Sequence, residues 1–440
     1  MSGSEQPILK LFFRDVFVGD IHFESERHCT LTYHNEWLQS GFNISPHLPF
    51  DKPWDPASTC RFIQNLFPEG SAFERLIETQ NLSKYNFYAI LKTIGHDTAG
   101  ALSFGIEEPS ESTNLRQITT EEVIERLEDE LRRNLAVWDG KYRLSVAGVQ
   151  NKLNVFCDEY GQYFLAEGRY ASTHILKFSN RQFPNIVLNE YFSMRLAKAI
   201  NLPIAGVELV SFGEHLALKV ERFDRKVSDD TVLKRHMIDG CQALNLAPES
   251  KYEQNFGSSK DVAHIREGAS LPKLFEFANT TNIPAQTKQL LMDWVLFNLI
   301  IGNSDAHGKN ISFYVGKNGI TLAPFYDLVS VVFEHQTNPE IETHLAMAID
   351  DNFDVNQIKI YDLLCLAETV GIHPSLLKRR MEKLLTLCTE QLKFLESEQL
   401  ELDQSSEESL SHYKTLITKR LAYFASELKQ FDDVNQSLHD

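Results

Sequence analysis

The change of pattern near Asp224 constrains the fold of this 440-residue chain more than any other feature. From Tyr142 to Phe223 the chain consists of short segments typical of strands, interrupted by one helix whose apolar residues recur at every fourth position between Leu188 and Ile200. Beyond Asp224 the pattern is mostly helical, except for a strand pair at Ile311 to Val315 and Ile320 to Ala323. We therefore expect a sheet region with one inserted helix, followed by a larger helical region.

The residues ahead of this sheet region form a further part of the chain. Strand patterns at Ile8 to Phe13 and Thr30 to Tyr33, with a helical stretch from Phe62 to Thr79, indicate a small α+β unit. A polar stretch from Gly105 to Asn114 has no apolar periodicity and marks a linker. The expected division is an α+β unit over 1–112, a sheet lobe over 113–224 and a helical lobe over 225–440.

Charge and cysteine usage exclude several classes of protein. The net charge of −18 at pH 7 opposes binding to phosphate backbones and to anionic lipid. The most apolar segment, Leu290 to Ile301, is interrupted by Asp293 and Asn298, and the first residues lack the pattern of a signal peptide. The six cysteines are scattered and form no CxxC pair. We therefore expect a cytoplasmic protein without a membrane span, without structural zinc and with little tendency to bind nucleic acid by itself.

The polar segment from Ile301 to Val315 holds the residues most typical of catalysis. It follows an apolar helix and precedes a strand, and loops at such junctions often carry catalytic groups. Asp305 and Asn310 have the separation of the base and the metal-binding amide in the catalytic loops of protein kinases. There the carboxylate accepts the proton of the substrate hydroxyl, and the amide oxygen binds Mg²⁺. Asp305 is therefore the expected base of an ATP-dependent phosphotransferase.

Asp327 is the expected second metal-binding carboxylate. It follows the strand pair, in Pro324-Phe-Tyr-Asp327, and with Asn310 it would offer the hard oxygen ligands that Mg²⁺ prefers. Each residue alone has a simpler interpretation: Asp305 in a turn, Asp327 as a helix N-cap, and His307 as a packed ring. The order of helix, loop, strand pair and second carboxylate favours a two-lobed kinase-like fold with ATP between the lobes.

Three segments of the sheet region are candidates for contacts with a nucleotide. Ser145 to Lys152 connects two strands and could close over phosphates through backbone N–H groups, although a simple hairpin is the commoner meaning of such a segment. Lys177 lies among apolar neighbours, and Glu190 is a candidate partner that would hold it against phosphates; a surface lysine and an unrelated glutamate are the alternative. Glu221 to Asp224 ends the last strand, either beside an adenine ring or as a plain strand end.

Taken together, six segments resemble the HipA family of bacterial toxin kinases. They are Ser145 to Lys152, His174 to Lys177, Asn189 to Tyr191, Val220 to Arg225, Gly302 to Asn310 and Pro324 to Asp327. The likeness extends to the amino-terminal unit through Asn65 to Pro68 and Ile94 to Gly100. It therefore covers nearly the whole chain in one order, which makes it more specific than any single motif.

The resemblance implies an α+β chain with a two-lobed protein-kinase-like fold, similar to that of phosphatidylinositol kinases, a small additional amino-terminal α+β unit and an all-helical carboxy-terminal region. It implies a serine/threonine protein kinase with ATP and Mg²⁺ as cofactors. Asp305 would be the catalytic base, and Asn310 and Asp327 would be the metal ligands. The implied nucleotide contacts are Ala147, Gly148, Val149, Gln150, Asn151, Lys152, Lys177, Glu221, Arg222, Phe223, His307, Lys309, Asn310, Tyr326 and Asp327.

The resemblance also implies regulation and partners. Ser145 matches the autophosphorylated serine of the family, and a phosphate there would repel ATP and keep the loop from closing. The implied partners are a helix-turn-helix antitoxin similar to HipB, operator DNA through that antitoxin, and a protein substrate such as glutamyl-tRNA synthetase, an aminoacyl-tRNA synthetase. Lys378 to Arg380 is a candidate DNA-facing patch, although a solvated helix face is the commoner meaning. A catalytically silent co-repressor and a small-molecule or lipid kinase are the alternatives.

Overall fold

The computed structural model describes residues 7–107, 114–129, 135, 137–139, 141–142, 151–168, 170–228, 231–395 and 403–438. The chain forms two compact units. Unit 1 consists of Met1–Asn180, Glu208–Pro248 and Phe313–Ile320, and unit 2 consists of Arg181–Val207, Glu249–Ser312 and Thr321–Asp440. The division at residues 112 and 224 that the sequence suggests stays a prediction. Within the described ranges, no helix has both the length and the apolar character needed to cross a membrane.

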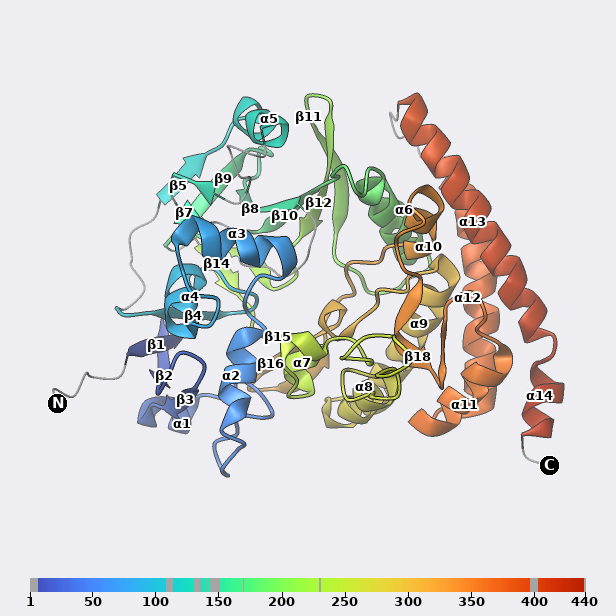
Figure 1. Ribbon diagram of the computed structural model, residues 1–440, viewed down its shortest axis with the longest axis horizontal. Coiled ribbons are helices and arrows are strands. Elements are labelled where there is room, and N and C mark those ends of the chain that lie inside the picture. The colour runs from blue at the N-terminus through green and yellow to red at the C-terminus, as the bar shows by residue number, and fades with distance from the viewer. Residues whose placement is uncertain are drawn as a thin grey trace. The chain divides into compact units, whose positions relative to one another are not determined.

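Unit 1 begins with a four-stranded sheet in the order β3-β2-β1-β4 (Figure 1). Its strands are β1 (Ile8–Phe13), β2 (Val16–Phe23), β3 (Cys29–Tyr33) and β4 (Leu102–Gly105), and its helices are α1 (Asn35–Ser40), α2 (Ala57–Gln64), α3 (Gly70–Gln80) and α4 (Phe87–Ile94). The two expected strands are confirmed. The helical stretch expected around 62–79 is present as the two helices α2 and α3. They are separated at Pro68, which has no N–H to donate, and Gly70, which has a φ of +56°.

The second sheet of unit 1 has six strands in the order β11-β12-β10-β8-β9-β5. They are β5 (Asn114–Gln117), β8 (Asn151–Cys157), β9 (Tyr163–Glu167), β10 (His174–Phe178), β11 (Val207–Phe212) and β12 (His215–Glu221). Helix α5 (Thr120–Glu128) begins with a capping box between Thr119 and Glu122, and a short pair of strands follows it, β6 (Val137–Trp138) and β7 (Lys141–Tyr142). Strands β8 to β12 confirm the strand-rich region expected from Tyr142 to Phe223, of which residues 143–150 lie outside the described residues.

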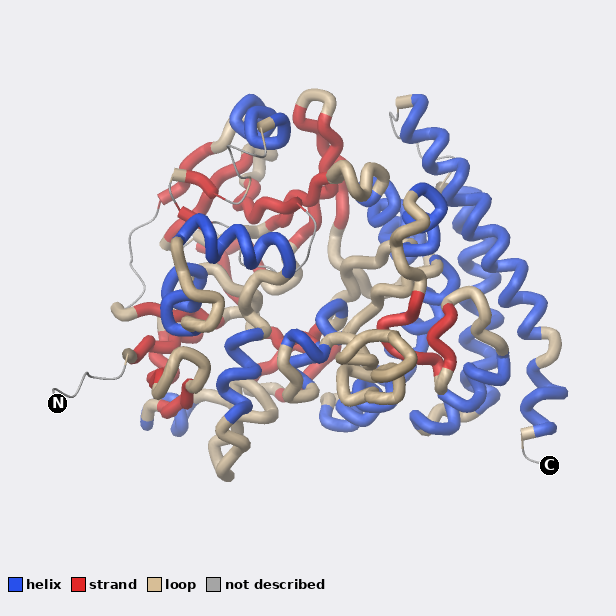
Figure 2. Tube along the Cα trace, viewed as in Figure 1, coloured by secondary structure: helices blue, strands red, loops and turns tan. Residues whose placement is uncertain are grey.

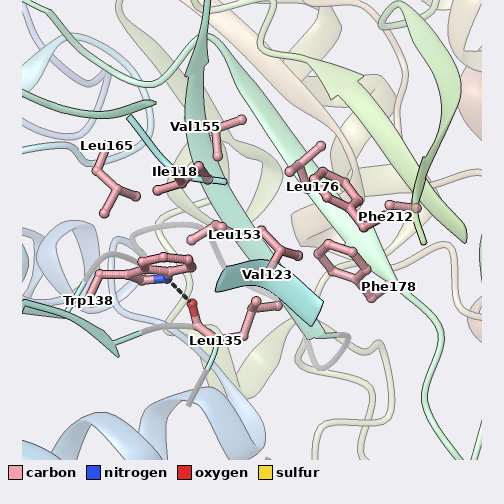
Figure 3. Close-up of a cluster of buried hydrophobic side chains, with 11 residues drawn as sticks. Ile118, Val123, Leu135, Trp138, Leu153, Val155, Leu165, Leu176, Phe178 and Phe212 are labelled. Atoms are coloured by element: carbon pink, nitrogen blue, oxygen red, sulfur yellow. Dashed lines mark hydrogen bonds between the residues drawn. The ribbon is translucent and has the colours of Figure 1, made fainter. Parts of the chain in front are cut away.

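One face of the six-stranded sheet carries the core shown in Figure 3. Alternate residues of β8 and β10 point to this face, because side chains alternate along a strand. Val123 of α5 packs onto them and is fully buried. Trp138 closes one side of the cluster, and its ring N–H donates to the carbonyl of Leu135 at 2.7 Å. The core consists of Ile118, Val123, Leu135, Trp138, Leu153, Val155, Leu165, Leu176, Phe178, Phe212 and Ala217.

The sheet content beyond Asp224 is larger than the sequence suggests. The pairs are β13 (Arg225–Ser228) with β14 (Thr231–Lys234), and β18 (His344–Ile349) with β19 (Asn352–Asp354). The expected strand pair is present as β16 (Ser312–Gly316) and β17 (Gly319–Leu322), and β15 (Met237–Asp239) pairs with β16. The expectation of only two strands here is therefore wrong, because strands this short leave too little alternation to detect.

Unit 2 is mostly helical, as the blue segments of Figure 2 show. Helices α9, α12 and α13 pack against one another (Figure 1). Helix α9 is buried on nearly all sides, which fits its apolar composition. The helices are α6 (Ile186–Ala199), α8 (Leu271–Phe277), α9 (Pro284–Ile301), α10 (Val331–Thr337), α11 (Ile360–Val370), α12 (Pro374–Phe394), α13 (Gln404–Leu428) and α14 (Phe431–Ser437), in addition to α7 (Gly240–Ala243) in unit 1.

A buried cluster of charges ties the two sheets of unit 1 together. Asp224 accepts from Arg222 at 2.9 Å, from Arg225 at 2.6 Å and from the N–H of Gly100 at 2.7 Å. Asp97 accepts from Arg225 at 2.8 Å and from the hydroxyl of Ser172 at 2.5 Å. Residues of the Ile94 to Gly100 segment, one of the segments that carry the family resemblance, therefore bind the end of the six-stranded sheet.

The electrostatics of this cluster favour the ionised carboxylates. Burial opposes ionisation, yet the charges of Arg222 and Arg225 hold the pKa of Asp97 well below its ordinary value. The pKa of Asp224 is lowered by the same two guanidinium groups, again against the effect of burial. Since the folded carboxyl pKa lies below the unfolded value of about 3.9, the cluster stabilises the fold above that pH and loses this contribution as the pH falls.

We expect Asp97→Asn to lower the free energy of unfolding by about 2 kcal/mol at pH 7, because two buried cations then share one carboxylate. Chemical denaturation measures this change. The matched control is Glu208→Gln, which removes the partner of Lys219 on a carboxylate that is 63% exposed, and should cost less than about 1 kcal/mol. The difference between wild type and Asp97→Asn should shrink below about pH 4; a difference that grows there would contradict the argument.

Candidate active site

The polar loop of unit 2 begins at a fixed helix end. Helix α9 ends at Gly302, whose φ of +71° is the left-handed conformation that favours glycine. A Cβ at Gly302 would lie 2.9 Å from a methyl group of Val332 and 3.2 Å from the guanidinium Nε of Arg420. The backbone conformation at the end of α9 is therefore fixed at Gly302, shortly before Asp305 in the sequence.

Two asparagines connect the end of α9 to the loop. The side-chain amide of Asn298 donates to the carbonyl of Trp294 at 2.9 Å and accepts from the Asn303 amide at 2.8 Å. The Asn303 oxygen then accepts the backbone N–H of Asp305 at 3.1 Å. Both asparagines are buried. This chain of amides positions the backbone of Asp305 relative to a rigid helix.

Arg420 of α13 donates hydrogen bonds to the carboxyl end of α9. Its Nε and Nη2 donate to the carbonyl of Leu299 at 3.0 and 2.6 Å, and Nη2 also donates to the carbonyl of Val355 at 3.0 Å. Burial lowers the pKa of Arg420 to about 10, a value that still leaves it charged at neutral pH. A cation at a helix carboxyl end is favourable because the terminal carbonyls carry partial negative charge.

Asp305 presents an exposed carboxylate at this loop. Its Oδ1 accepts the hydroxyl of Tyr252 at 2.9 Å. Its backbone carbonyl accepts the N–H of His307 at 2.8 Å and the side-chain amide of Asn310 at 3.0 Å. The loop is thus folded back on itself, and within the described ranges Oδ2 of Asp305 accepts no hydrogen bond.

The side-chain amide of Asn310 is oriented so that its oxygen can bind a cation. Because its amide nitrogen donates to the carbonyl of Asp305, its amide oxygen points the other way. Asn310 is 7% exposed, and its backbone N–H donates to the carbonyl of His307 at 2.9 Å. The oxygen of Asn310 is therefore the group that can face a metal ion.

Tyr326 directly precedes Asp327 and connects the segment of Asp327 to the loop that carries Asn310. The Tyr326 hydroxyl donates to the carbonyl of Lys309 at 2.6 Å and bonds the hydroxyl of Ser312 at 2.8 Å. Asp327 itself has a φ of +57°, a conformation that aspartate adopts more readily than most residues. These contacts bring the segments that carry Asn310 and Asp327 together in unit 2.

The segment after Asp327 is held by Asn189 of α6. The Asn189 side chain bonds both the N–H and the carbonyl of Ser330 at 2.9 Å, and its amide also donates to Glu334 at 2.8 Å. Burial raises the pKa of Glu334, and the Asn189 hydrogen bond works against that rise. The N-cap of α10 is Ser330, so the alternative that Asp327 caps this helix is wrong.

The remaining loop residues are buried. The Nδ1 of His307 accepts the N–H of Lys309 at 3.2 Å, and its ring packs edge-on against Tyr252 with 5.3 Å between centroids. His307 and Lys309 are 6% and 7% exposed. In the described residues, no three His, Cys, Asp or Glu side chains form a metal cluster. A cation here would have Asn310 and Asp327 as protein ligands and take further oxygens from other molecules, as Mg²⁺ commonly does.

The sheet-side candidates belong to unit 1. Ser145, Ala147, Gly148, Val149 and Gln150 lie outside the described residues. Asn151 and Lys152 open strand β8, and Lys152 pairs directly with Lys177 of β10 in the antiparallel register. Directly opposed residues share one face of a sheet, so two lysines lie side by side.

Glu221, Arg222 and Phe223, the candidates for adenine contacts at the end of β12, differ in their hydrogen bonds and in their exposure. The N–H of Arg222 donates to the carbonyl of Thr173 at 2.9 Å, and its carbonyl accepts the N–H of Arg225 at 3.0 Å. The Arg222 guanidinium belongs to the charge cluster of unit 1. Glu221 is exposed, and the carbonyl of Phe223 accepts the hydroxyl of Tyr314 at 2.9 Å. Of the three, Arg222 therefore has its side chain and both backbone groups bonded within unit 1.

The basic run Lys378 to Arg380 is largely neutralised within unit 2. Lys378 lies 2.7 Å from Asp432, and Arg380 forms a bidentate pair with the buried Asp293 of α9. Burial raises the pKa of Asp293, while the Arg380 hydrogen bonds and charge lower it. The run is therefore mainly a set of intramolecular ion pairs, as expected for an ordinary helix face.

The described fold is a mixed α/β chain with a polar loop of catalytic type, and comparisons with known proteins agree with it. The HipA N-terminal domain matches residues 9–105, and the HipA-like C-terminal domain matches residues 144–392. The chain is 39% identical over 441 residues to the serine/threonine-protein kinase toxin HipA of Shewanella oneidensis, covering 99% of this chain and 100% of that protein.

A solved structure is also similar to this chain along nearly its whole length. The chain matches the structure of the Shewanella oneidensis MR-1 toxin–antitoxin complex of HipA, HipB and operator DNA with a TM-score of 0.86 and 39% identity. The match covers 97% of this chain and 99% of that one. The chain therefore belongs to the HipA family.

Sequence reasoning missed Arg420, Asn303 and Tyr252 as contacts of the loop.

We expect Arg420→Leu to lower the free energy of unfolding by about 3 kcal/mol, because the buried carbonyls of Leu299 and Val355 lose their donor. Denaturant titration of the full chain measures the loss. The neighbouring exposed Lys419→Leu is the matched control and should stay within about 0.5 kcal/mol of wild type. Equal losses in the two variants would contradict the role of Arg420.

Proposed function

We propose that the chain is an ATP- and Mg²⁺-dependent serine/threonine protein kinase that acts as the toxin of a type II toxin–antitoxin system. The observation that carries the proposal is the arrangement of Asp305, Asn310 and Asp327 on two segments that Tyr326 joins. The kinase-like two-lobed fold is part of the same proposal. The name of the Shewanella relative supports it, since that protein is a serine/threonine-protein kinase toxin.

Each residue has one role in this proposal. Asp305 accepts the proton of the substrate hydroxyl while the hydroxyl oxygen forms its bond to the γ-phosphorus and the bond to ADP breaks. Asn310 and Asp327 hold Mg²⁺, which when bound neutralises charge on the triphosphate. The neutral amide of Asn310 and the carboxylate of Asp327 together offer oxygen ligands of the type this ion requires.

The proposed nucleotide contacts outside the metal site are of three kinds. Lys152 and Lys177 are proposed for phosphates, because their register places two cations on one sheet face. Glu221 and Phe223 are proposed for adenine through their backbone groups. His307, Lys309 and Tyr326 support the loop that carries the metal ligands. Asn151 and the residues from Ala147 to Gln150 are proposed on the family resemblance alone.

The proposed partners follow from the relative of known structure, which is a complex of HipA with HipB and operator DNA. We propose a HipB-like helix-turn-helix antitoxin as a partner of this chain, with DNA bound through the antitoxin. The net charge of −18 and the internal pairing of Lys378 and Arg380 support an indirect contact with DNA. An aminoacyl-tRNA synthetase, glutamyl-tRNA synthetase in particular, is the proposed protein substrate.

We expect the wild-type chain to transfer labelled γ-phosphate in the presence of Mg²⁺ to itself or to purified glutamyl-tRNA synthetase. Asp305→Asn should lower kcat by about 10²- to 10⁴-fold, because the proton acceptor is lost. Asp327→Asn should abolish the response to added Mg²⁺. Asp261→Asn, an exposed aspartate of the same unit, is the matched control and should keep wild-type turnover.

Absence of transfer by the wild type, with the HipB-like antitoxin still bound, would instead favour the catalytically silent co-repressor.

We expect Ser145 to gain one phosphate on incubation with ATP and Mg²⁺, and the modified chain to turn over more slowly, since the added charge repels the nucleotide phosphates. Intact-mass and peptide spectrometry locate the phosphate. Ser145→Ala should not be modified there, and Ser145→Asp should reproduce the slow form. A phosphorylated chain with undiminished turnover would rule out this off switch.

A further inference from the structure

The contact between Tyr252 and Asp305 is the strongest feature that the proposed roles do not use. The hydroxyl of Tyr252 donates to Oδ1 of Asp305 at 2.9 Å, although Tyr252 lies 53 residues earlier in the chain. Both residues belong to unit 2, and the Tyr252 side chain is 38% exposed. The Tyr252 hydroxyl therefore bonds one of the two oxygens of the exposed Asp305 carboxylate.

The backbone around Tyr252 is fixed on both sides. The carbonyl of Lys251 accepts the N–H of Gly308 in the catalytic loop at 2.9 Å. The N–H of Glu253 donates to the carbonyl of Ala346 at 2.9 Å. A Cβ on Gly268 would lie 1.8 Å from the carbonyl oxygen of Tyr252, so only glycine permits this approach. The position of Tyr252 is thus set by the fold.

Glu253 strengthens this anchoring. Its side chain is buried, and it accepts the N–H of Ala348 at 2.8 Å and the guanidinium of Arg266 at 2.7 Å. Burial raises the pKa of Glu253, and these two partners oppose the rise. The residue after Tyr252 is therefore bonded into strand β18 through both its backbone and its side chain.

The ring of Tyr252 is oriented as well as its backbone. It meets the buried ring of His307 edge-on, with 5.3 Å between centroids and 87° between planes, a favourable aromatic geometry. His307 in turn is tied to Lys309 in the same loop. The hydroxyl is therefore presented to Asp305 by a side chain with little freedom.

We propose that Tyr252 is a positioning residue that holds Asp305 in the orientation needed to accept the proton of the substrate hydroxyl. A base whose side chain is oriented by a third group is a common arrangement in active sites, and small displacements of such a base are costly. Tyr252 occupies Oδ1 and leaves Oδ2 of the exposed carboxylate for the substrate. The inference rests on the proposed kinase function.

The alternative use of the same contact is inhibition, with Tyr252 competing for the carboxylate. The anchoring on both sides of Tyr252 speaks against it, because a competing group has to leave when substrate arrives. The two uses predict opposite changes on removal of the hydroxyl: positioning predicts a slower enzyme, and competition predicts a faster one.

The test is Tyr252→Phe in the full chain, with the acceptor that the wild type labels, either the chain itself or glutamyl-tRNA synthetase. We expect kcat to fall about tenfold while KM for ATP changes less than about twofold, since the nucleotide contacts are untouched. In the Asp305→Asn background, Tyr252→Phe should cause no further loss, because the group it orients is gone. Tyr160→Phe removes the same hydroxyl from a tyrosine that is 81% exposed and should keep wild-type kcat.

Three results would overturn the inference: an unchanged or higher kcat in Tyr252→Phe, a rise in KM with kcat preserved, or a loss that adds in full to that of Asp305→Asn. An active wild type with any of these results leaves the kinase function standing and removes only the role of Tyr252. A wild type that labels neither acceptor removes the kinase function and the inference with it.

Discussion

The buried carboxyl end of α9 is the constraint on which the candidate site depends. A helix end leaves carbonyls without intrahelical donors, and burial makes such carbonyls costly unless donors are supplied. Arg420 supplies them for Leu299, and the left-handed Gly302 turns the chain at once into the loop. Since Asn303 then accepts the N–H of Asp305, the backbone of Asp305 is held by the capped end of the helix as well as by the loop.

Buried charged groups are bonded either to opposite charges, as in unit 1 and as Asp293 and Glu253 are in unit 2, or to neutral groups. In unit 1, Asp97 and Asp224 balance two buried guanidinium groups, and the cluster joins sheet elements that are more than 120 residues apart in sequence. In unit 2, buried Arg420 is bonded to carbonyls, and the buried carboxylate Glu334 is bonded to an amide. The candidate loop, in contrast, carries an exposed carboxylate, Asp305.

The sequence predicts the elements that local pattern determines. Strands β8 to β12 and the apolar helix α9 follow from periodicity within a short window. Tyr252 and Arg420 could not be found in this way, because their partners lie 53 and 121 residues away and no local signal marks either one. No local signal marks the bond between the Arg222 side chain and Asp224 either, and the nucleotide contact expected at Arg222 stays a prediction.

Asp327 shows how the fold and the candidate site constrain each other. A non-glycine residue in a left-handed conformation costs on the order of 1 kcal/mol, so it persists only where its surroundings over-determine it. Tyr326 bonds Lys309 and Ser312 immediately before it, and Asn189 bonds both backbone groups of Ser330 shortly after it. The contacts of Tyr326 and Asn189 therefore fix the backbone on both sides of Asp327 and stabilise a conformation that a glycine would adopt without this cost.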